Sequence, residues 1–303
     1  MRKIFSRAIE KVSNENEKIV FITGDLGYNA LENVQESMKN RFINAGVAEQ
    51  NMVGMAAGMA YKGYKVFCYS IAPFIVYRCL EQTRNDVCFH DLPVFLVGNG
   101  GGYGYGIMGA THHAIEDIAC LSPLPNMTCW IPAFADDVEY CIREIVKNNK
   151  PAYLRLGLGN PYPDKALQIS TVNHVIVSKQ PKITLIALGP IVQNAIEAVK
   201  ELDCVDIFTI LKVPVAEISG ELEQSISKTG NVIVLEEHVQ RGGLGEQLLM
   251  KMVESGVRFH NFKSLHAKGY PTQLYGNQKY YQEISGIDAK SIALVIDEII
   301  QNF

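Results

Sequence analysis

The chain has 303 residues, of which 48% are hydrophobic and 20% are charged, and its formal net charge at pH 7 is −4. This length is enough for two domains of ordinary size, and the composition is typical of a globular enzyme. The sequence has no basic block or stripe, which argues against a nucleic-acid partner, and no apolar run of the roughly 18 residues that a membrane-spanning helix needs.

The N-terminal segment MRKIFSRAIEKVS predicts an amphipathic helix, and it lacks the long apolar core of a signal peptide. The seven cysteines form no CxxC pair, and most of them lie in apolar stretches. We therefore expect buried free thiols in a reducing cytoplasm and no metal site on this chain.

Short β-rich runs alternate with helical patterns through the first half of the chain. The predicted strands are 18–23, 65–69, 93–97, 127–131 and 152–156. The predicted helices are 49–62, 71–89 and 136–147, with Asp136 as an N-cap and Gly63 as a C-terminal stop. The strands are continuously apolar, which predicts burial on both faces, and the repeated β-α-β order predicts a parallel, doubly wound sheet.

The pattern thins from about Gly157 to Pro181, where Gly and Pro are frequent, and a second βα series follows. Its predicted strands are 182–188, 205–211, 232–235 and 258–262, and its predicted helices are 192–202, 217–228, 243–254 and 288–300. The sequence therefore predicts an α/β fold of two doubly wound domains, with mostly parallel sheets and helices on both faces. The expected division is 1–160 for the first domain, 161–181 for a linker and 182–303 for the second domain.

Residues 41–63, RFINAGVAEQNMVGMAAGMAYKG, place one carboxylate, Glu49, directly before an uncharged segment of mostly small residues. Gly54 and Gly58 are four residues apart and therefore share one face of a helix. Glycine inside a helix costs about 1 kcal/mol relative to alanine, so we expect the close packing of another backbone as compensation. Ordinary core packing, with Glu49 as a first-turn acid favoured by the helix dipole, explains the same stretch equally well at this point.

The same stretch resembles the segment of the transketolase family of thiamine-diphosphate enzymes that carries the activating glutamate. Other segments resemble motifs of that family in the same order: GDLG (24–27), SIAPFIVYRCLEQTRND (70–86), GATHHAIEDIA (109–119), PNMTCWIPAFADDV (125–138), ITLIALGPIVQNAIEAVKEL (183–202) and VIVLEEHVQRGGLGE (232–246). Together they cover most of the chain, which makes the resemblance specific.

The resemblance covers two of the three transketolase domains, namely the pyrimidine-binding and the C-terminal domain. The metal signature of the diphosphate-binding domain, GDG followed by a downstream Asn, is absent, since Gly24-Asp25-Leu26 lacks the second Gly. The resemblance therefore implies the second subunit of a split transketolase. It also implies a partner subunit that carries GDG…N and holds the diphosphate with Mg²⁺ (or Ca²⁺), in an α2β2 heterotetramer.

The resemblance assigns roles to five residues. In this family a Glu carboxyl hydrogen-bonds N1′ of the aminopyrimidine and favours the imino tautomer, whose N4′ removes the thiazolium C2 proton, and Glu49 matches that position. Phe74 matches the ring that stacks on the aminopyrimidine, and Tyr77 completes the pocket, although both also suit plain core aromatics. Asp25 ends a strand, where it holds the cofactor or donor or else caps the next turn. His112 matches a histidine that contacts oxygens of the donor.

Three departures from the family pattern each remove a charged or polar contact. Gly100 stands in place of a substrate-contacting His, Met108 in place of the Asp that reads a donor hydroxyl, and Leu158 in place of a phosphate-binding Arg. Charge-assisted contacts to phosphate are among the stronger ones. We therefore expect an atypical substrate that is unphosphorylated, less hydroxylated or attached to a carrier such as a nucleotide.

The segment GNGGGYGYGIMG predicts a reshaped substrate loop that is lined by Tyr103 and Tyr105. His113, which replaces a Gln of the family motif, belongs to the same predicted loop. A flexible Gly-rich turn whose contacts come from a partner is the alternative interpretation.

The sequence thus predicts a subunit of a transketolase-like transferase of carbohydrate metabolism that moves a two-carbon ketol unit from a small sugar substrate. The alternative is the β subunit of a 2-oxoacid dehydrogenase, or another decarboxylating or acyloin-forming thiamine-diphosphate enzyme. A non-catalytic α/β subunit that binds a nucleotide or regulates a partner is a third possibility.

Overall fold

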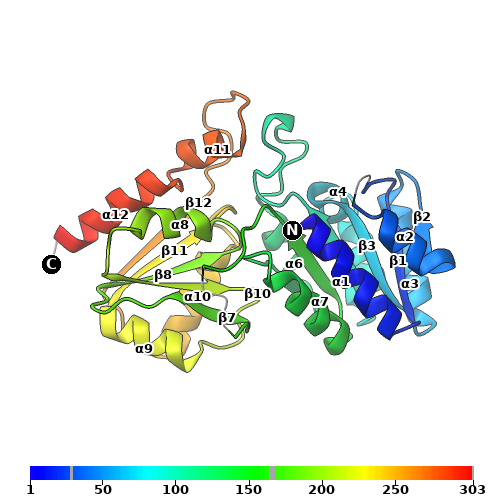
Figure 1. Ribbon diagram of the computed structural model, residues 1–303, viewed down its shortest axis with the longest axis horizontal. Coiled ribbons are helices and arrows are strands. Elements are labelled where there is room, and N and C mark those ends of the chain that lie inside the picture. Colours follow the sequence, from blue (N-terminus) through cyan, green and yellow to red (C-terminus); the bar gives the residue numbers. More distant parts are fainter. Residues whose placement is uncertain (28–29, 164–167, 302–303) are drawn as a thin grey trace.

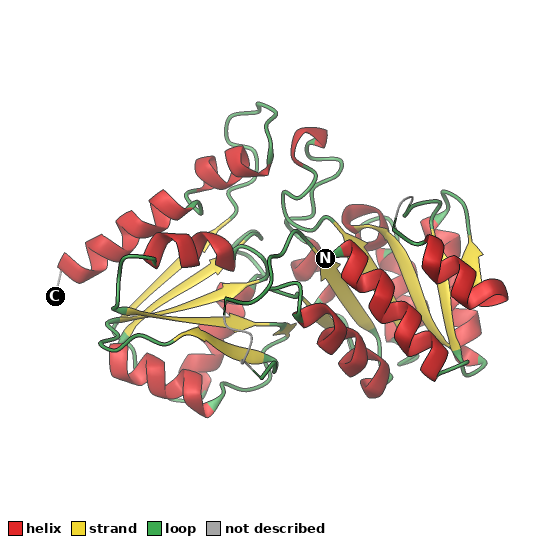
Figure 2. Ribbon diagram, viewed as in Figure 1, coloured by secondary structure: helices red, strands yellow, loops and turns green. Residues whose placement is uncertain are grey.

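A computed structural model describes residues 1–27, 30–163 and 168–301 of the chain. It contains two mostly parallel sheets, one in each half of the chain, which lie side by side (Figure 1). Helices pack on both faces of each sheet, so the predicted fold class is confirmed. Figure 2 shows the two sheets side by side, each with helices on its faces.

The first half forms a seven-stranded sheet of order β10-β5-β6-β4-β3-β1-β2. Its strands are β1 (Ile19–Thr23), β2 (Phe42–Asn44), β3 (Lys65–Ile71), β4 (Val94–Asn99), β5 (Thr128–Trp130) and β6 (Ala152–Leu156), joined by β10 (Lys212–Val213) from the second half. Its helices are α1 (Arg2–Glu15), α2 (Glu32–Met38), η1 (Lys39–Arg41), α3 (Glu49–Tyr61), α4 (Ala72–Val76), α5 (Leu80–Gln82), η2 (Thr83–Cys88), η3 (Gly106–Met108), α6 (Asp117–Leu121) and α7 (Asp137–Asn148).

The second half forms a five-stranded sheet of order β12-β11-β8-β9-β7. Its strands are β7 (Val172–Ile176), β8 (Ile183–Leu188), β9 (Val205–Ile210), β11 (Asn231–Glu236) and β12 (Asn261–His266). Its helices are α8 (Val192–Val199), α9 (Gly220–Thr229), α10 (Leu244–Glu254), α11 (Gln278–Ser285) and α12 (Ala289–Gln301). In each sheet one edge strand is antiparallel, β10 in the first and β7 in the second.

The continuous apolar runs form the central strands, as the sequence predicts. Every residue of β1, β6, β8, β9 and β11 is buried. Helices α1, α2 and α7 belong to the apolar core on one side of the first sheet, and α3 and α4 to the core on the other side. In the second half, α8 and α12 cover one face, and α9 and α10 cover the opposite face.

Two sequence predictions differ from the structure. The helix expected at 71–89 is interrupted after α4 and ends in the π-helical segment η2, a rare form that often occurs at functional sites. The expected linker contains β7, which pairs with β9 at the sheet edge, where a half-polar strand remains stable.

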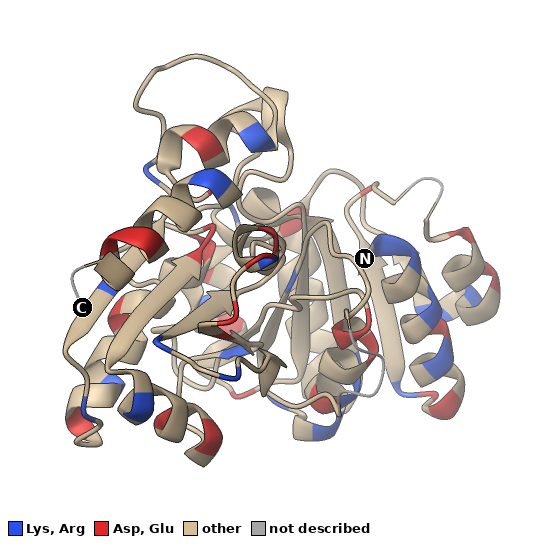
Figure 3. Cartoon of the chain, turned by 60° about the vertical axis from the view of Figure 1, so that its left-hand side comes forward, with Lys and Arg blue, Asp and Glu red and all other residues tan. Residues whose placement is uncertain are grey.

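The two halves are joined by backbone pairing and by buried polar contacts. Strand β10 pairs with β5 across the boundary, with Lys212 opposite Trp130. Figure 3 shows Lys and Arg residues interspersed with Asp and Glu along the outer helices. None of the helices in the described part of the chain is both long and apolar enough to span a membrane.

Candidate active site

Glu49 opens helix α3, and its side chain is almost completely buried, at 2% exposure. Its Oε2 atom accepts a hydrogen bond from the Arg78 guanidinium at 2.6 Å, and its Oε1 atom accepts one from the Ser70 hydroxyl at 3.1 Å. Gly24, at the end of β1, lies beside the same carboxylate. The carboxylate therefore sits at the carboxyl ends of β1 and β3, the edge of a parallel sheet where ligands bind.

An aromatic group borders this carboxylate. The Phe74 ring, on α4, is half-buried, and the Arg78 guanidinium carbon lies 4.3 Å from its centre. The His112 ring is centred 5.2 Å from the Phe74 ring and 5.8 Å from the Tyr105 ring. Glu49, Phe74, His112 and Tyr105 are thus linked by a chain of contacts through Arg78, although they come from separate segments of the chain.

Tyr77 is anchored to the start of α6 by two hydrogen bonds. Its hydroxyl donates to the Glu116 carboxylate at 2.9 Å and accepts from the Glu116 backbone N–H at 3.1 Å. Burial, and then the nearby charges of Asp117 and Glu116, raise the pKa of Tyr77 well above its usual range. Tyr77 therefore stays a neutral phenol that links α4 to α6.

Asp25 directly follows Gly24 and adopts a left-handed backbone conformation, with φ of 58°. Its carboxylate accepts a hydrogen bond at 2.8 Å from the side-chain amide of Asn44, which ends the neighbouring strand β2. Asp25 therefore lies on the same sheet edge as Glu49 and braces the loop that enters α3.

The glycine-rich loop before α6 exposes part of its apolar surface. Gly100 has φ of 75° and packs so closely on the Tyr105 ring that no side chain fits there. The Tyr105 hydroxyl accepts a hydrogen bond from the Asn99 side chain at 2.8 Å. Met108, in the short helix η3, is 51% exposed and lies in the turn that leads to His112.

Tyr103 and His113 are placed differently from the prediction that they line the substrate loop. Both are buried at the interface between the two halves of the chain, which we call the seam. The Tyr103 hydroxyl donates to the Gly269 carbonyl at 2.9 Å, and the His113 ring stacks on the Tyr270 ring. The His113 Nε2 atom lies 2.8 Å from the Gly106 carbonyl oxygen. These residues therefore fix the loop to the second half, and in Figure 1 the loops before α6 and α11 project on the same side.

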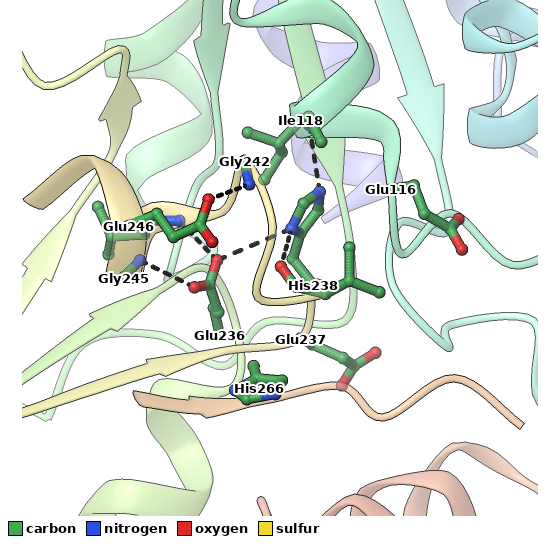
Figure 4. Close-up of polar contacts among 12 residues, drawn as sticks. Glu116, Ile118, Glu236, Glu237, His238, Gly242, Gly245, Glu246 and His266 are labelled. Atoms are coloured by element: carbon green, nitrogen blue, oxygen red, sulfur yellow. Dashed lines mark hydrogen bonds and ion pairs between the residues drawn. The ribbon is translucent and has the colours of Figure 1, made fainter. Parts of the chain in front are cut away.

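The same seam holds two buried glutamates and a buried histidine. Glu236 accepts hydrogen bonds from the backbone N–H groups of Leu244 and Gly245 at the start of α10, as Figure 4 shows. Burial raises the pKa of Glu236 to about 7 despite these two donors. Glu237 accepts from the Tyr103 N–H at 2.6 Å and from the amides of two glutamines, Gln278 and Gln282.

His238 completes the link between the two halves. Its Nδ1 atom lies 2.7 Å from the Val239 carbonyl oxygen, and its Nε2 atom accepts a hydrogen bond from the Ala119 N–H at 3.2 Å. This arrangement requires a neutral ring that carries its proton on Nδ1. Burial lowers the pKa of His238 to about 4, which agrees with that arrangement.

Two residues that the sequence motifs do not single out lie next to the loop. Arg2 and Lys3, at the start of α1, line a cavity of about 460 Å³ together with Gly100, Tyr105 and Leu158. The N-terminus lies between the two halves of the molecule (Figure 1). Arg2 and Lys3 are adjacent in the sequence, but only the packing of α1 brings them next to Gly100 and Leu158. These are two of the positions where a polar residue of the family pattern is replaced.

The Glu49 carboxylate and the Phe74 ring fit an aminopyrimidine ring. A buried carboxyl can share a proton with a ring nitrogen, and Phe74 offers a flat apolar face. Across residues 1–27, 30–163 and 168–301, no group of three His, Cys, Asp or Glu side chains could hold a metal ion.

Comparison with protein-family models divides the chain into two matched regions. Residues 1–161 match the transketolase pyrimidine-binding domain, and residues 173–292 match the transketolase C-terminal domain.

Among curated proteins, a 1-deoxy-D-xylulose-5-phosphate synthase of Clostridium perfringens is 31% identical over 311 residues, which cover 98% of this chain and 48% of the synthase. The chain thus spans about half the length of that relative. A subunit of an apulose-4-phosphate transketolase of Phocaeicola vulgatus is 31% identical over 267 residues, which cover 84% of each chain.

Solved structures share the fold. A split-gene transketolase, described as an inactive β4 tetramer, has a TM-score of 0.83 and 26% identity, and the match covers 99% of this chain and 97% of that one. Transketolase from Leishmania mexicana has a TM-score of 0.79 at 18% identity, covering 100% of this chain and 45% of that one.

Proposed function

The chain belongs to the transketolase family, and from that premise we propose that it is one subunit of a split, thiamine-diphosphate-dependent enzyme that transfers a two-carbon ketol unit. In this proposal the chain binds the aminopyrimidine half of the cofactor. The observation that carries the proposal is the buried Glu49 carboxylate beside the Phe74 ring, at the carboxyl edge of the first sheet.

Glu49 is proposed to bind N1′ of the ring and to hold a shared proton there, which is general acid–base catalysis through the cofactor. When bound, thiamine diphosphate supplies a nucleophilic thiazolium carbon and an electron sink. Phe74 stacks on the aminopyrimidine. Tyr77 fixes the position of Phe74 through its hydrogen bonds to Glu116, and Asp25 braces the edge of the pocket next to Glu49.

His112 is proposed to contact oxygen atoms of the substrate, since its ring lies between Phe74 and Tyr105. The exposed Met108 next to it offers no hydrogen bond of the kind that a carboxylate would. Arg2 and Lys3 line the adjoining cavity and support a substrate that still carries an anionic group. The similarity to a subunit of an apulose-4-phosphate transketolase is consistent with a substrate other than the common sugar phosphates.

The proposal requires a partner subunit that binds the diphosphate with Mg²⁺ (or Ca²⁺). Gly54 and Gly58 of α3 support an interface between subunits, because a methyl group added at either would meet no atom of this chain within 4 Å. The close approach that the sequence predicts for this face is therefore not made within the chain. We propose that another copy or partner packs there in an α2β2 heterotetramer, and seven unpaired cysteines support a reducing, cytoplasmic setting.

An acyloin-forming or decarboxylating thiamine-diphosphate enzyme, such as a 2-oxoacid dehydrogenase with this chain as its β subunit, is the second candidate. The observation that favours it is Met108, an apolar residue beside His112 where a hydroxylated donor would need a polar partner.

The experiment is reconstitution with a partner of similar length that carries GDG…N, followed by assays with ketose phosphates and with pyruvate. The proposal predicts turnover that depends on thiamine diphosphate, with a ketose as the donor. Turnover of pyruvate alone would favour the second candidate, and turnover without thiamine diphosphate would overturn both.

A further inference from the structure

The carboxylate of Glu49 is not reachable in the conformation of the structure, because its side chain is only 2% exposed. Each of its oxygen atoms already accepts a hydrogen bond, one from Ser70 and one from Arg78. Any ligand that binds this carboxylate must therefore displace one of its neighbours.

The two neighbours differ in their freedom to move. Ser70 lies on strand β3 and is fully buried, so its hydroxyl is held by the sheet. The side chain of Arg78 is 42% exposed and leaves the turn between α4 and α5. Because Glu49 is buried, losing Arg78 would leave its carboxylate without a charge partner unless a ligand takes over the hydrogen bond. Arg78 is therefore the neighbour that such a ligand can displace, since its guanidinium can move into water while Ser70 stays in place.

Arg78 also makes the second contact that an aminopyrimidine would need. Its guanidinium is planar and lies 4.3 Å from the centre of the Phe74 ring while it donates to Glu49 at 2.6 Å. A flat heterocycle that stacks on Phe74 and hydrogen-bonds Glu49 uses the same ring and the same carboxylate. The guanidinium and the heterocycle compete for these two partners.

We propose that Arg78 is a removable cover of the aminopyrimidine site, occupying the Glu49 and Phe74 contacts until the ring displaces it. This inference rests on the proposed function. While it covers the site, the Arg78 guanidinium also balances the negative charge of the Glu49 carboxylate.

The test uses the 303-residue chain without a partner and a probe that lacks the diphosphate, 4-amino-5-hydroxymethyl-2-methylpyrimidine. Its dissociation constant is measured by titration calorimetry for the wild type, Arg78→Met and Arg78→Gln. Arg84→Met is the matched control, because Arg84 is also exposed and its guanidinium hydrogen-bonds the adjacent Asn85 rather than Glu49. Thermal unfolding of each variant checks that the chain is folded.

We expect Arg78→Met and Arg78→Gln to bind the probe at least about tenfold more tightly than the wild type, which corresponds to about 1.4 kcal/mol. Arg84→Met should match the wild type. Nitrogen NMR of the wild type should show the Arg78 side-chain signal shifting towards that of a solvated guanidinium as the probe is added. Equal or weaker binding by both folded Arg78 variants, or no detectable binding, overturns the proposal, as does an Arg78 signal that the probe leaves unchanged.

Failure of this inference can be distinguished from failure of the proposed function. If the reconstituted complex needs thiamine diphosphate but the Arg78 variants bind the probe no better than the wild type, only the cover is excluded. If turnover is independent of thiamine diphosphate, the proposed function itself fails.

Discussion

Two regions with buried glutamates satisfy their carboxylates in opposite ways. In the seam between the halves, Glu236 is held by backbone N–H groups of α10, and Glu237 by a backbone N–H and two side-chain amides. At the carboxyl edge of the first sheet, Glu49 depends on the Ser70 hydroxyl and on Arg78, whose side chain is 42% exposed. The seam glutamates have fixed donors, whereas Glu49 has a partner that can leave.

Under the proposed function, this difference separates a structural site from a functional one. Backbone donors at a helix start cannot move without unfolding the helix, so they hold a carboxylate in place permanently. An exposed guanidinium can move into water when a ligand takes over its hydrogen bond to a buried carboxylate. Under the proposed function, burial alone does not mark the reactive glutamate, and the exposure of its charge partner does.

The largest expected effect is on turnover. Glu49→Gln should lower kcat of the reconstituted enzyme by about 10³-fold or more, because an amide cannot share a proton with a ring nitrogen. Unfolding free energy should change by less than about 1 kcal/mol, since Arg78 can return to solvent. The matched change in the seam, Glu236→Gln, should alter stability and leave kcat near that of the wild type. Kinetics and urea unfolding on both variants check this contrast, and a reversed pattern would refute it.

The seam should respond to truncation by losing stability. Glu237→Ala leaves the buried Tyr103 N–H without an acceptor, so we expect a loss of about 3 kcal/mol in unfolding free energy. Glu283→Ala is the control. Glu283 is exposed and lies on α11, the helix that supplies the two glutamines bound to Glu237, and surface substitutions of this kind should cost less than about 1 kcal/mol. Equal effects of the two substitutions in denaturant titrations would show that the Glu237 network does not stabilise the seam.

The pH dependence of stability contains two opposing contributions from the seam. His238 has a folded-state pKa of about 4, below its ordinary value, so its stabilisation is present above pH about 6.5 and decreases as pH falls towards 4. Glu236 has a folded-state pKa of about 7, so its contribution is present below pH about 4.5 and is lost as pH rises through 7.

His238→Gln isolates one of these contributions. On going from pH 7 to pH 5, the wild type should lose about 2 kcal/mol more unfolding free energy than the variant does. Asp117, Arg155 and Glu236 surround the ring in both proteins, so their contributions largely cancel in this difference. A variant with the same pH dependence as the wild type would show that His238 is not buried as a neutral ring.

A smaller effect is expected on the affinity for thiamine diphosphate. Phe74→Leu should weaken binding of thiamine diphosphate to the reconstituted complex about tenfold, because the stacking face is lost while an apolar side chain remains. Phe89→Leu is the control, since the Phe89 side chain is 76% exposed and lies beyond η2. Fluorescence titration measures both constants, and unchanged affinity in Phe74→Leu would remove Phe74 from the pocket.

The sequence predicts most of the fold because continuous apolar runs identify the central strands. It misses α2, α6 and α11, which have 7, 5 and 8 residues and are too short for a clear helical period. Strand β7 is missed because it is a partly polar edge strand, whose His174 stacks on Phe208 of the neighbouring strand.

The candidate site is predictable where the signal is local. Glu49, Phe74 and His112 lie in segments whose motifs resemble the family, and in the structure a chain of contacts through Arg78 links them. The roles of Tyr103 and His113 depend on residues 269–281, more than about 150 positions away, so no local pattern predicts their burial. The contact between Arg78 and Glu49 depends on a side-chain conformation, which a sequence motif does not specify.

The most direct measurement of the central claim is the rate at which the C2 proton of thiamine diphosphate exchanges with deuterium in the reconstituted complex, followed by quenched-flow NMR. We predict rapid exchange in the wild type and exchange at least about 100-fold slower in Glu49→Gln. Equal exchange rates in the two complexes would contradict the claim, because the activating acid would then be some group other than Glu49.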